Sequence, residues 1–281
     1  MSNAPDSLAT LRREIDSIDE DMHDLLMRRA EIVVEIGRAK ADEGGPTFRP
    51  AREAQLLRRL LARHSGALSG DVVVRIWREI IAASIRLQGD FVVGLCPVEG
   101  DAETLDLAHA QFGLDAEVRH YGSPAQVALA VGRGDAQAGL VPLANAGDGA
   151  DWWAGSDLPG DVHVVARVPW TLPASSVGAY ILSNTAPEES GDDRSVFVIG
   201  SDTTVSRGRL SELASANGLD VGEQAAAPVD GGIVHLLDVA GFVSADDPRV
   251  RGVATLLDDA SVRRLGAYAS PWAGPAGSET E

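Results

Sequence analysis

The sequence is poor in cysteine, in long apolar runs and in lysine, and each shortage restricts what the chain can be. Cys96 is the only cysteine, which excludes an internal disulfide and a metal site built from cysteines. The longest apolar runs, such as Ile80 to Ser84 and Phe91 to Cys96, are far shorter than the ~18 residues that a membrane span requires. The first six residues lack the basic and apolar segments of a secretory signal. We therefore expect a cytoplasmic protein with no membrane segment.

Basic charge is also scarce, and it is unevenly distributed. The formal net charge at pH 7 is -18, which argues against nucleic acid and anionic membranes as partners, because both bind surfaces with a surplus of basic charge. Up to Asp90 the chain holds 14 basic against 15 acidic side chains, whereas the remainder holds 10 against 27. A chain of 281 residues is long enough for two or three domains. The first third is expected to differ in kind from the acidic remainder.

Lysine is almost absent: Lys40 is the single lysine among 24 basic side chains. The guanidinium of arginine is planar and has several donors, whereas lysine has a compact ammonium on a flexible side chain. A site that places one positive charge against one small oxygen therefore cannot freely replace lysine by arginine. A chance survivor on a solvated helix surface is the simpler interpretation of a lone lysine. Its neighbours must therefore decide between the two.

The first ninety residues are predicted to form an all-α domain of three helices. Apolar residues recur at three- and four-residue spacing from Leu8 to Ile36, which predicts one long amphipathic helix ended by the Gly-Gly-Pro segment at 44–46. Helices in globular domains average about three turns, so a stripe of this length is expected to pack against a second chain. Pro50 opens a second helix to about His64, and a third is predicted from about Asp71 to Gln88.

The remainder is predicted to contain two smaller domains. Strands and helices alternate between residues 91 and 143, which implies a parallel, doubly wound sheet, and two further strands complete a small α/β domain at 91–186. Pro187 to Asp193 is interpreted as a linker. Residues 193–272 have the β-α-β-β-α-β order of a ferredoxin-like α+β domain. The small, polar tail at 273–281 is predicted to be disordered.

Polar side chains interrupt the apolar faces of the three predicted helices. Arg29 stands where the stripe of the first helix calls for an apolar residue, and Lys40 follows eleven residues later, rotated by about 20°. Buried charges without partners cost several kcal/mol, so such groups require anions to meet them. The side chains that converge on the predicted bundle interior are Arg29, Lys40, Arg52, Glu53, Ser84 and Gln88.

Arg12 cannot join this group within one chain. It lies seventeen residues before Arg29, which on a straight helix is about 25 Å away and roughly 100° off that face. In a dimer with antiparallel long helices it reaches the pocket of the other subunit. The sequence thus predicts a homodimer in which each pocket takes Arg12 from the partner chain.

Residues Leu8 to Gln88 resemble the all-helical chorismate mutases. The positions that match that family's site in order and spacing are Arg12, Arg29, Lys40, the Phe-Arg-Pro-Ala-Arg-Glu segment at 48–53, Ser84 and Gln88. The resemblance implies an intertwined dimer of three-helix chains that converts chorismate to prephenate in aromatic amino acid biosynthesis. It implies no metal and no cofactor, because the reaction is a pericyclic shift within a dicarboxylate.

The resemblance also implies a role for each matching side chain. Arg29 and Arg12 of the partner subunit would clamp the two carboxylates of chorismate, assisted by Ser84 and Arg52. A set of oriented donors of this kind holds the reactive conformer and stabilises charge as it develops.

Three further roles concern the reacting ether and the ring. Lys40 and Gln88 would donate to the breaking ether oxygen, where a point ammonium fits better than a planar fork. Glu53 would accept from the ring hydroxyl. Arg49 stands where some members of the family have an acidic residue, and its role in substrate binding is open.

Two alternatives concern these same ninety residues. The helical domain of an isochorismate pyruvate lyase has a similar bundle, and product analysis with both substrates would separate the two activities. The second alternative is a coiled dimerisation arm without catalysis, for which Lys40→Ala and Arg29→Ala should have no effect. We expect instead folded variants with activity lower by orders of magnitude, and a poor enzyme from Lys40→Arg.

The acidic remainder resembles parts of the prephenate dehydratases. Residues 139–145 (Gly-Leu-Val-Pro-Leu-Ala-Asn) are similar to a motif of their first lobe, and the last domain is similar to their ACT regulatory domain, as in the bifunctional chorismate mutase/prephenate dehydratase. Where dehydratases have a catalytic Thr-Arg-Phe, this chain has Val177-Gly178-Ala179, and too few residues remain for a second lobe. We therefore expect no dehydratase chemistry, with the full bifunctional enzyme as the alternative. Trp152 and Trp153 are expected to anchor a loop, and the histidines show no metal spacing.

Overall fold

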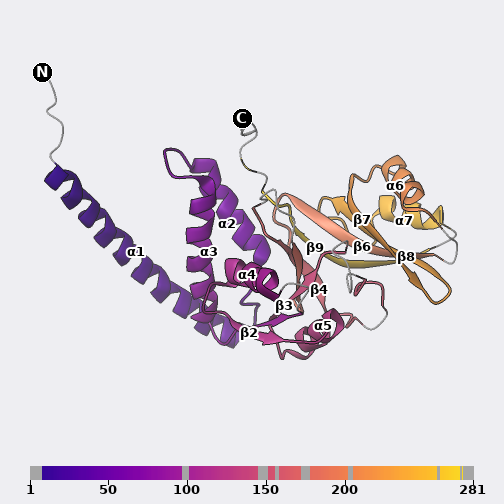
Figure 1. The fold of residues 1–281 in the computed structure, drawn as a ribbon, viewed down its shortest axis with the longest axis horizontal. Coiled ribbons are helices and arrows are strands. Elements are labelled where there is room, and N and C mark those ends of the chain that lie inside the picture. The colour runs from indigo at the N-terminus through magenta and orange to yellow at the C-terminus, as the bar shows by residue number, and fades with distance from the viewer. Residues whose placement is uncertain are drawn as a thin grey trace, which may run out of the picture. The chain divides into compact units, whose positions relative to one another are not determined.

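The structure is a computed structural model, and it describes residues 8–96, 101–144, 151–155, 158–171, 178–201, 205–257, 260–272 and 274 (Figure 1). The chain divides into two compact units. The first unit comprises Met1–Thr47 with Ala83–Asp90, and the second comprises Phe48–Ala82 with Phe91–Glu281. The predicted boundary after residue 90 does not coincide with this division.

The first unit is dominated by α1, which spans Leu8–Glu43 in a single helix of 36 residues. The predicted long helix is therefore present. Its apolar stripe is exposed in the single chain, with Leu8 at 63% and Leu25 at 65% of full exposure. Gly44 and Gly45 follow with φ of 78° and 142°, a region that glycine adopts without steric cost, and they end the helix.

The second unit is built around a nine-stranded sheet in the order β2-β1-β3-β5-β4-β9-β6-β8-β7. The strands are β1 (Val92–Leu95), β2 (Glu117–His120), β3 (Ala138–Pro142), β4 (His163–Val168), β5 (Ala179–Ser183), β6 (Asp193–Ser201), β7 (Val221–Val229), β8 (Gly232–Ala240) and β9 (Ser261–Ala269). The other helices are α2 (Pro50–Arg63), α3 (Gly70–Arg86), α4 (Asp101–Phe112), α5 (Pro124–Arg133), α6 (Arg207–Ala216) and α7 (Pro248–Thr255).

The sheet is mixed, and only part of it is the predicted parallel sheet. β1 pairs in parallel with β2 and β3, as the alternation of strands and helices indicated. β5 then pairs antiparallel with both β3 and β4, so the doubly wound pattern stops there. A short connection between two neighbouring strands permits only an antiparallel pair, whereas a parallel pair needs a crossover.

The sheet continues across the predicted boundary between the α/β and the ferredoxin-like regions. β4 pairs in parallel with β9 through Val164 and Gly266. A Cβ atom at Gly266 would lie 2.0 Å from the carbonyl oxygen of Val164, so this close approach of two strands requires glycine. The two predicted domains therefore share one sheet.

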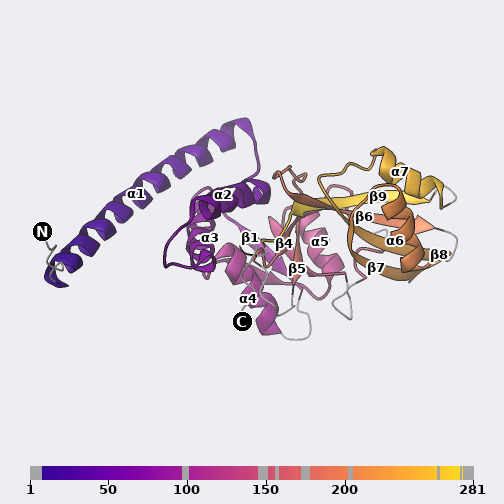
Figure 2. The same ribbon diagram turned by 90° about the horizontal axis from the view of Figure 1, so that it is seen from above.

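The last four strands and two helices follow the predicted β-α-β-β-α-β order, and α6 and α7 lie next to each other on one face of them (Figure 2). Helix α6 begins at Ser206, whose side chain accepts a hydrogen bond from the backbone of Arg209, and Leu210 and Leu213 point into the shared core. On the strands, Phe197 and Leu237 complete this core. Alternation along β6 and β8 leaves the opposite face for a second core.

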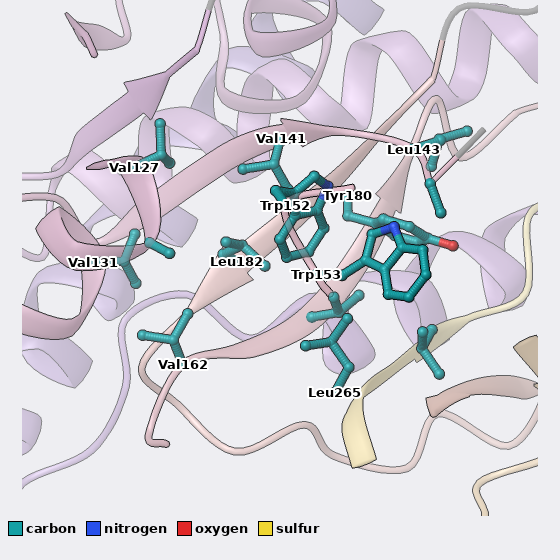
Figure 3. Close-up of a cluster of buried hydrophobic side chains, with 14 of the residues drawn as sticks. Val127, Val131, Val141, Leu143, Trp152, Trp153, Val162, Tyr180, Leu182 and Leu265 are labelled. Atoms are coloured by element: carbon teal, nitrogen blue, oxygen red, sulfur yellow. The ribbon is translucent and has the colours of Figure 1, made fainter. Parts of the chain in front are cut away.

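That second core contains the two tryptophans for which an anchoring role was expected (Figure 3). Trp152 and Trp153 are buried against Tyr180 and Leu182, and the Trp152 indole donates to the carbonyl of Pro142 over 2.9 Å. The interpretation as a hydrophobic anchor is confirmed.

Helix α2 and the first part of α3 belong to the second unit because their apolar faces pack on it. Ala54, Leu57 and Val74 form a cluster with Trp170 and Ala269. This burial explains why residues 48–82 group with the sheet and not with α1.

Candidate functional site

In the first unit, Arg29 of α1 meets the last turn of α3. Its guanidinium donates a short hydrogen bond to the hydroxyl of Ser84. The partial burial of Arg29 lowers its pKa, yet a guanidinium stays protonated across the whole physiological range. A cation and a hydroxyl are thus brought together, as the interrupted stripes of the two helices predicted.

Lys40 contacts Gln88, which follows α3, and Pro46, which follows α1. Its ammonium donates to the side-chain oxygen of Gln88 over 3.0 Å and to the carbonyl of Pro46 over 2.7 Å. The turn at Gly44 and Gly45 returns the chain so that Pro46 reaches back to Lys40. The only lysine of the chain is therefore held in place rather than left on a solvated surface.

Gln88 connects the two cations. Its amide group donates to the carbonyl of Ser84 over 2.8 Å, while its oxygen accepts from Lys40. Gly37 permits this approach, because a Cβ atom there would lie 3.1 Å from the Cα of Gln88. Four of the predicted site residues, Arg29, Lys40, Ser84 and Gln88, thus form one hydrogen-bonded group.

Arg12 stands apart from this group. It lies on the exposed surface near the start of α1, seventeen residues before Arg29. The structure contains one chain, and the expectation that Arg12 serves the partner subunit stays a prediction.

In the second unit, the predicted residues of α2 have different surroundings. Arg52 is exposed. Arg49, whose role was open, forms a two-pronged ion pair with Glu188, with distances of 3.0 Å and 2.9 Å. Both side chains of this pair are 40% exposed, so it contributes only about 0–1 kcal/mol to stability.

Glu53 is buried, with 8% of its surface exposed. Its Oε2 atom accepts from the guanidinium of Arg78 over 2.7 Å and from the amide of Gln111 over 3.2 Å. Desolvation raises the pKa of Glu53 and lowers that of Arg78, and their mutual attraction opposes both shifts.

Our reading of the sequence missed Arg78 and Gln111. Arg78 stands four residues after Val74 and three before Ile81, both buried, so it is a cation within an apolar stripe. Gln111 stands three residues after the buried Ala108 on α4. The same test that found Arg29 would have found Arg78, whereas the pairing with Glu53 needed the fold.

Across the described residues, no group of three or more His, Cys, Asp or Glu side chains is arranged to hold a metal ion. In the same part of the chain, no helix combines the length and the apolar character needed to cross a membrane.

The first unit gathers two cations, an amide and a hydroxyl in one place. A site with these groups can bind a small anion through charge-assisted hydrogen bonds. Residues 11–89 match the family described as chorismate mutase type II. The resemblance read from the residues is confirmed: the chain contains a helical domain of this family, followed by a mixed-sheet α/β region.

Two curated relatives extend the likeness beyond this domain. A "Bifunctional chorismate mutase/prephenate dehydratase" of Pseudomonas aeruginosa is 30% identical over 159 residues, which cover 52% of this chain and 41% of the relative. A relative of the same name from Aquifex aeolicus is 29% identical over 174 residues, which cover 59% of this chain and 48% of the relative. The chain thus spans less than half the length of these relatives.

Among solved structures, a prephenate dehydratase of Arthrobacter aurescens in complex with L-Phe overlays on 65% of this chain and 92% of its own, with 14% identity and a TM-score of 0.48.

Proposed function

We propose that this protein is a chorismate mutase, which rearranges chorismate to prephenate. The observation that carries the proposal is the single hydrogen-bonded group of Arg29, Lys40, Ser84 and Gln88 in the first unit. The match of residues 11–89 to the chorismate mutase type II family supports the same activity.

The chemistry of the substrate fits this group of side chains. Chorismate is a dicarboxylate, and Arg29 offers a guanidinium that pairs with one carboxylate, assisted by the Ser84 hydroxyl. Lys40 and Gln88 offer an ammonium and an amide to the ether oxygen, which gains negative charge as its bond to carbon breaks. Donors that are already oriented stabilise this charge without reorganising, which lowers the barrier.

The residues of α2 complete the proposal by their likeness to the family. Arg52, which is exposed, assists at a carboxylate. Glu53 accepts from the ring hydroxyl. Arg49 is paired with Glu188, and we propose no direct contact of Arg49 with the ring.

We further propose a homodimer in which Arg12 of the partner subunit binds the second carboxylate. The exposed apolar stripe of α1 supports this, because a row of exposed residues such as Leu8, Ile18 and Leu25 is the kind of surface that a second chain covers. Mixing two variants tests it.

Arg12→Ala and Arg29→Ala should each be nearly inactive. If subunits exchange at random in an equal mixture, half of all dimers contain one chain of each variant. Each such heterodimer has one intact pocket out of two, so about a quarter of the wild-type activity should return. No recovery after confirmed exchange would show that Arg12 does not act across the dimer.

The decisive assay offers the purified protein three substrates separately: chorismate, prephenate and isochorismate. Prephenate formed from chorismate, and abolished in Arg29→Ala, is the expected result. Phenylpyruvate from prephenate would reveal the bifunctional enzyme, which the names of the curated relatives favour as the second candidate. Salicylate and pyruvate from isochorismate would reveal the lyase, and no turnover of any substrate would refute the proposal.

The position that replaces the dehydratase motif is described only in part. Gly178 immediately precedes β5 and Ala179 is its first residue, whereas Val177 lies outside the described residues. Neither described residue offers a hydroxyl or a guanidinium, so we propose that dehydratase activity is absent. We also propose a cytoplasmic location, supported by the lone cysteine and testable by cell fractionation.

A further inference from the structure

Glu53 is bound in a way that the family resemblance did not anticipate. Both hydrogen bonds to its carboxylate, from Arg78 and from Gln111, go to the same oxygen, Oε2. Within the described part of the chain, the other oxygen, Oε1, accepts no hydrogen bond. An ionised carboxylate has about four acceptor sites, two on each oxygen. Oε2 is therefore held by two donors, whereas Oε1 can still accept hydrogen bonds.

The two donors come from different parts of the fold. Arg78 lies on α3, within the residues that match the mutase family, whereas Gln111 lies on α4, beyond residue 89 where that match ends. Gln111 is itself 5% exposed, and a buried amide of this kind requires a hydrogen-bond partner, which Glu53 provides. The next residue in the chain, Phe112, forms an aromatic cluster with Phe48 and Phe91, with ring centroids 5.3 to 5.8 Å apart, which joins the segment before α2 to the end of α4.

The charges agree with a positioning role. A carboxylate with 8% exposure needs a cation, and Arg78 supplies it. A second donor is not required for charge balance, and its effect is directional. Two donors on one oxygen fix the plane of the carboxylate better than one donor does.

We infer that Arg78 and Gln111 are positioning residues that hold Glu53 by Oε2 and leave Oε1 for the hydroxyl of the substrate ring. Through Gln111, the α/β region contributes to substrate recognition by the mutase. This inference rests on the proposed function, because it takes chorismate as the substrate of Glu53.

The test compares steady-state kinetics of the full-length protein with those of Gln111→Leu. This variant removes the donor and keeps most of the side-chain volume. Because the ring hydroxyl is unchanged in the reaction, its contact acts equally on the ground state and the transition state, so KM should rise about tenfold while kcat stays within about twofold. Thr104→Val is the matched control: it also replaces a buried polar side chain of α4, two turns away, and should leave KM unchanged.

A substrate analogue without the ring hydroxyl separates positioning from a general structural effect. Wild type and Gln111→Leu should turn over this analogue with the same KM, because no hydroxyl is left for Glu53 to recognise. Arg78→Lys keeps the charge opposite Glu53 with a single ammonium, so it should fold and show the same pattern with a smaller rise in KM.

The outcomes distinguish the two proposals. An active wild type with a Gln111→Leu variant whose KM is within twofold would overturn the inference and leave the mutase activity intact. A rise in KM that persists with the analogue would show a general structural role and would also overturn it. A wild type that does not convert chorismate would overturn the proposed function, and this inference with it.

Discussion

Replacing Lys40 is the sharpest perturbation of the proposed site, because Lys40 is the only lysine in the sequence. Its Nζ atom donates to groups of the protein itself, among them the side chain of Gln88 and the carbonyl of Pro46. Lys40→Ala therefore removes a donor from the proposed transition state and also removes the hydrogen bonds to Gln88 and Pro46, which support the fold. The two effects differ in size and can be measured separately.

The catalytic effect should be the larger one. A donor aimed at developing charge is worth about 2.7–4 kcal/mol, or about 10²–10³ in kcat. The structural effect is smaller: hydrogen bonds to a charged group contribute about 1.5–3 kcal/mol when partly buried, which lowers Tm by roughly 2–4 °C per kcal/mol in a protein of this size. Lys40→Ala should thus be a folded protein with at least a hundredfold lower kcat.

Two further variants complete this experiment. Lys40→Arg keeps the charge but replaces a point donor by a planar fork, and we expect kcat to fall at least tenfold with little change in Tm. Arg38→Ala removes an exposed cation two residues away on α1 and should behave as wild type. The assay is prephenate formation at saturating chorismate, with thermal unfolding followed by circular dichroism. A kcat of Lys40→Ala within threefold of wild type would refute the assignment of Lys40 to the ether oxygen.

Three other predictions concern the second unit. The hydroxyl of Tyr180 has no hydrogen-bond partner among the described residues, whereas that of Tyr268 donates to Asp238 over 2.5 Å. Tyr180→Phe should therefore leave the free energy of unfolding unchanged or raise it by about 1 kcal/mol, whereas Tyr268→Phe should lower it by about 1.5–3 kcal/mol in urea unfolding; the reverse order would contradict the assignment. Burial raises the pKa of both tyrosines above the value of about 10 that they have in the unfolded chain. Above that pH the unfolded chain releases these protons while the folded protein keeps them, so the free energy of unfolding falls as pH rises. An absorbance titration at 295 nm should show their ionisation only together with alkaline unfolding. Burial also raises the pKa of the Cys96 thiol, which should react with a thiol reagent in urea but not in the native protein.

The sequence was informative about the site wherever the signal was local. Arg29, Lys40 and Ser84 each interrupt a helical stripe, and helical periodicity alone places each of them on a defined face, whereas Gln88 lies two residues beyond the end of α3. The side-chain amide of Gln88 donates to the backbone carbonyl of Ser84 four residues earlier, a local contact that the sequence spacing permits.

Contacts between residues distant in sequence could not be predicted in this way. Gln111 meets Glu53 across 58 residues, and nothing in the spacing of either helix encodes that pairing. The same holds for the sheet: the pairing of Val164 with Gly266 joins two regions that we predicted as separate domains. Periodicity specifies which face of a strand is buried and leaves its neighbour in the sheet undetermined.

The segment from Pro187 to Asp193, which we interpreted as a linker, is instead fastened to α2. Arg58 donates to the carbonyls of Ser190 and Asp192 over 3.2 Å and 2.6 Å, and to the carbonyl of Ser270 over 3.2 Å. Arg49 pairs with Glu188 one turn before the region of α2 that carries Arg52 and Glu53. A linker allows its flanking parts to move, whereas a guanidinium bonded to three backbone carbonyls holds them in one arrangement.

This attachment gives the acidic part of the chain a physical role. α2 carries Arg52 and Glu53, and it contacts the rest of the second unit in three ways: its apolar face packs with Trp170, Arg58 donates to backbone carbonyls, and Glu53 accepts from Gln111 of α4. A helix fixed in this way cannot shift without breaking contacts that belong to the sheet. These contacts support α2 physically, whatever chemistry the C-terminal region itself performs.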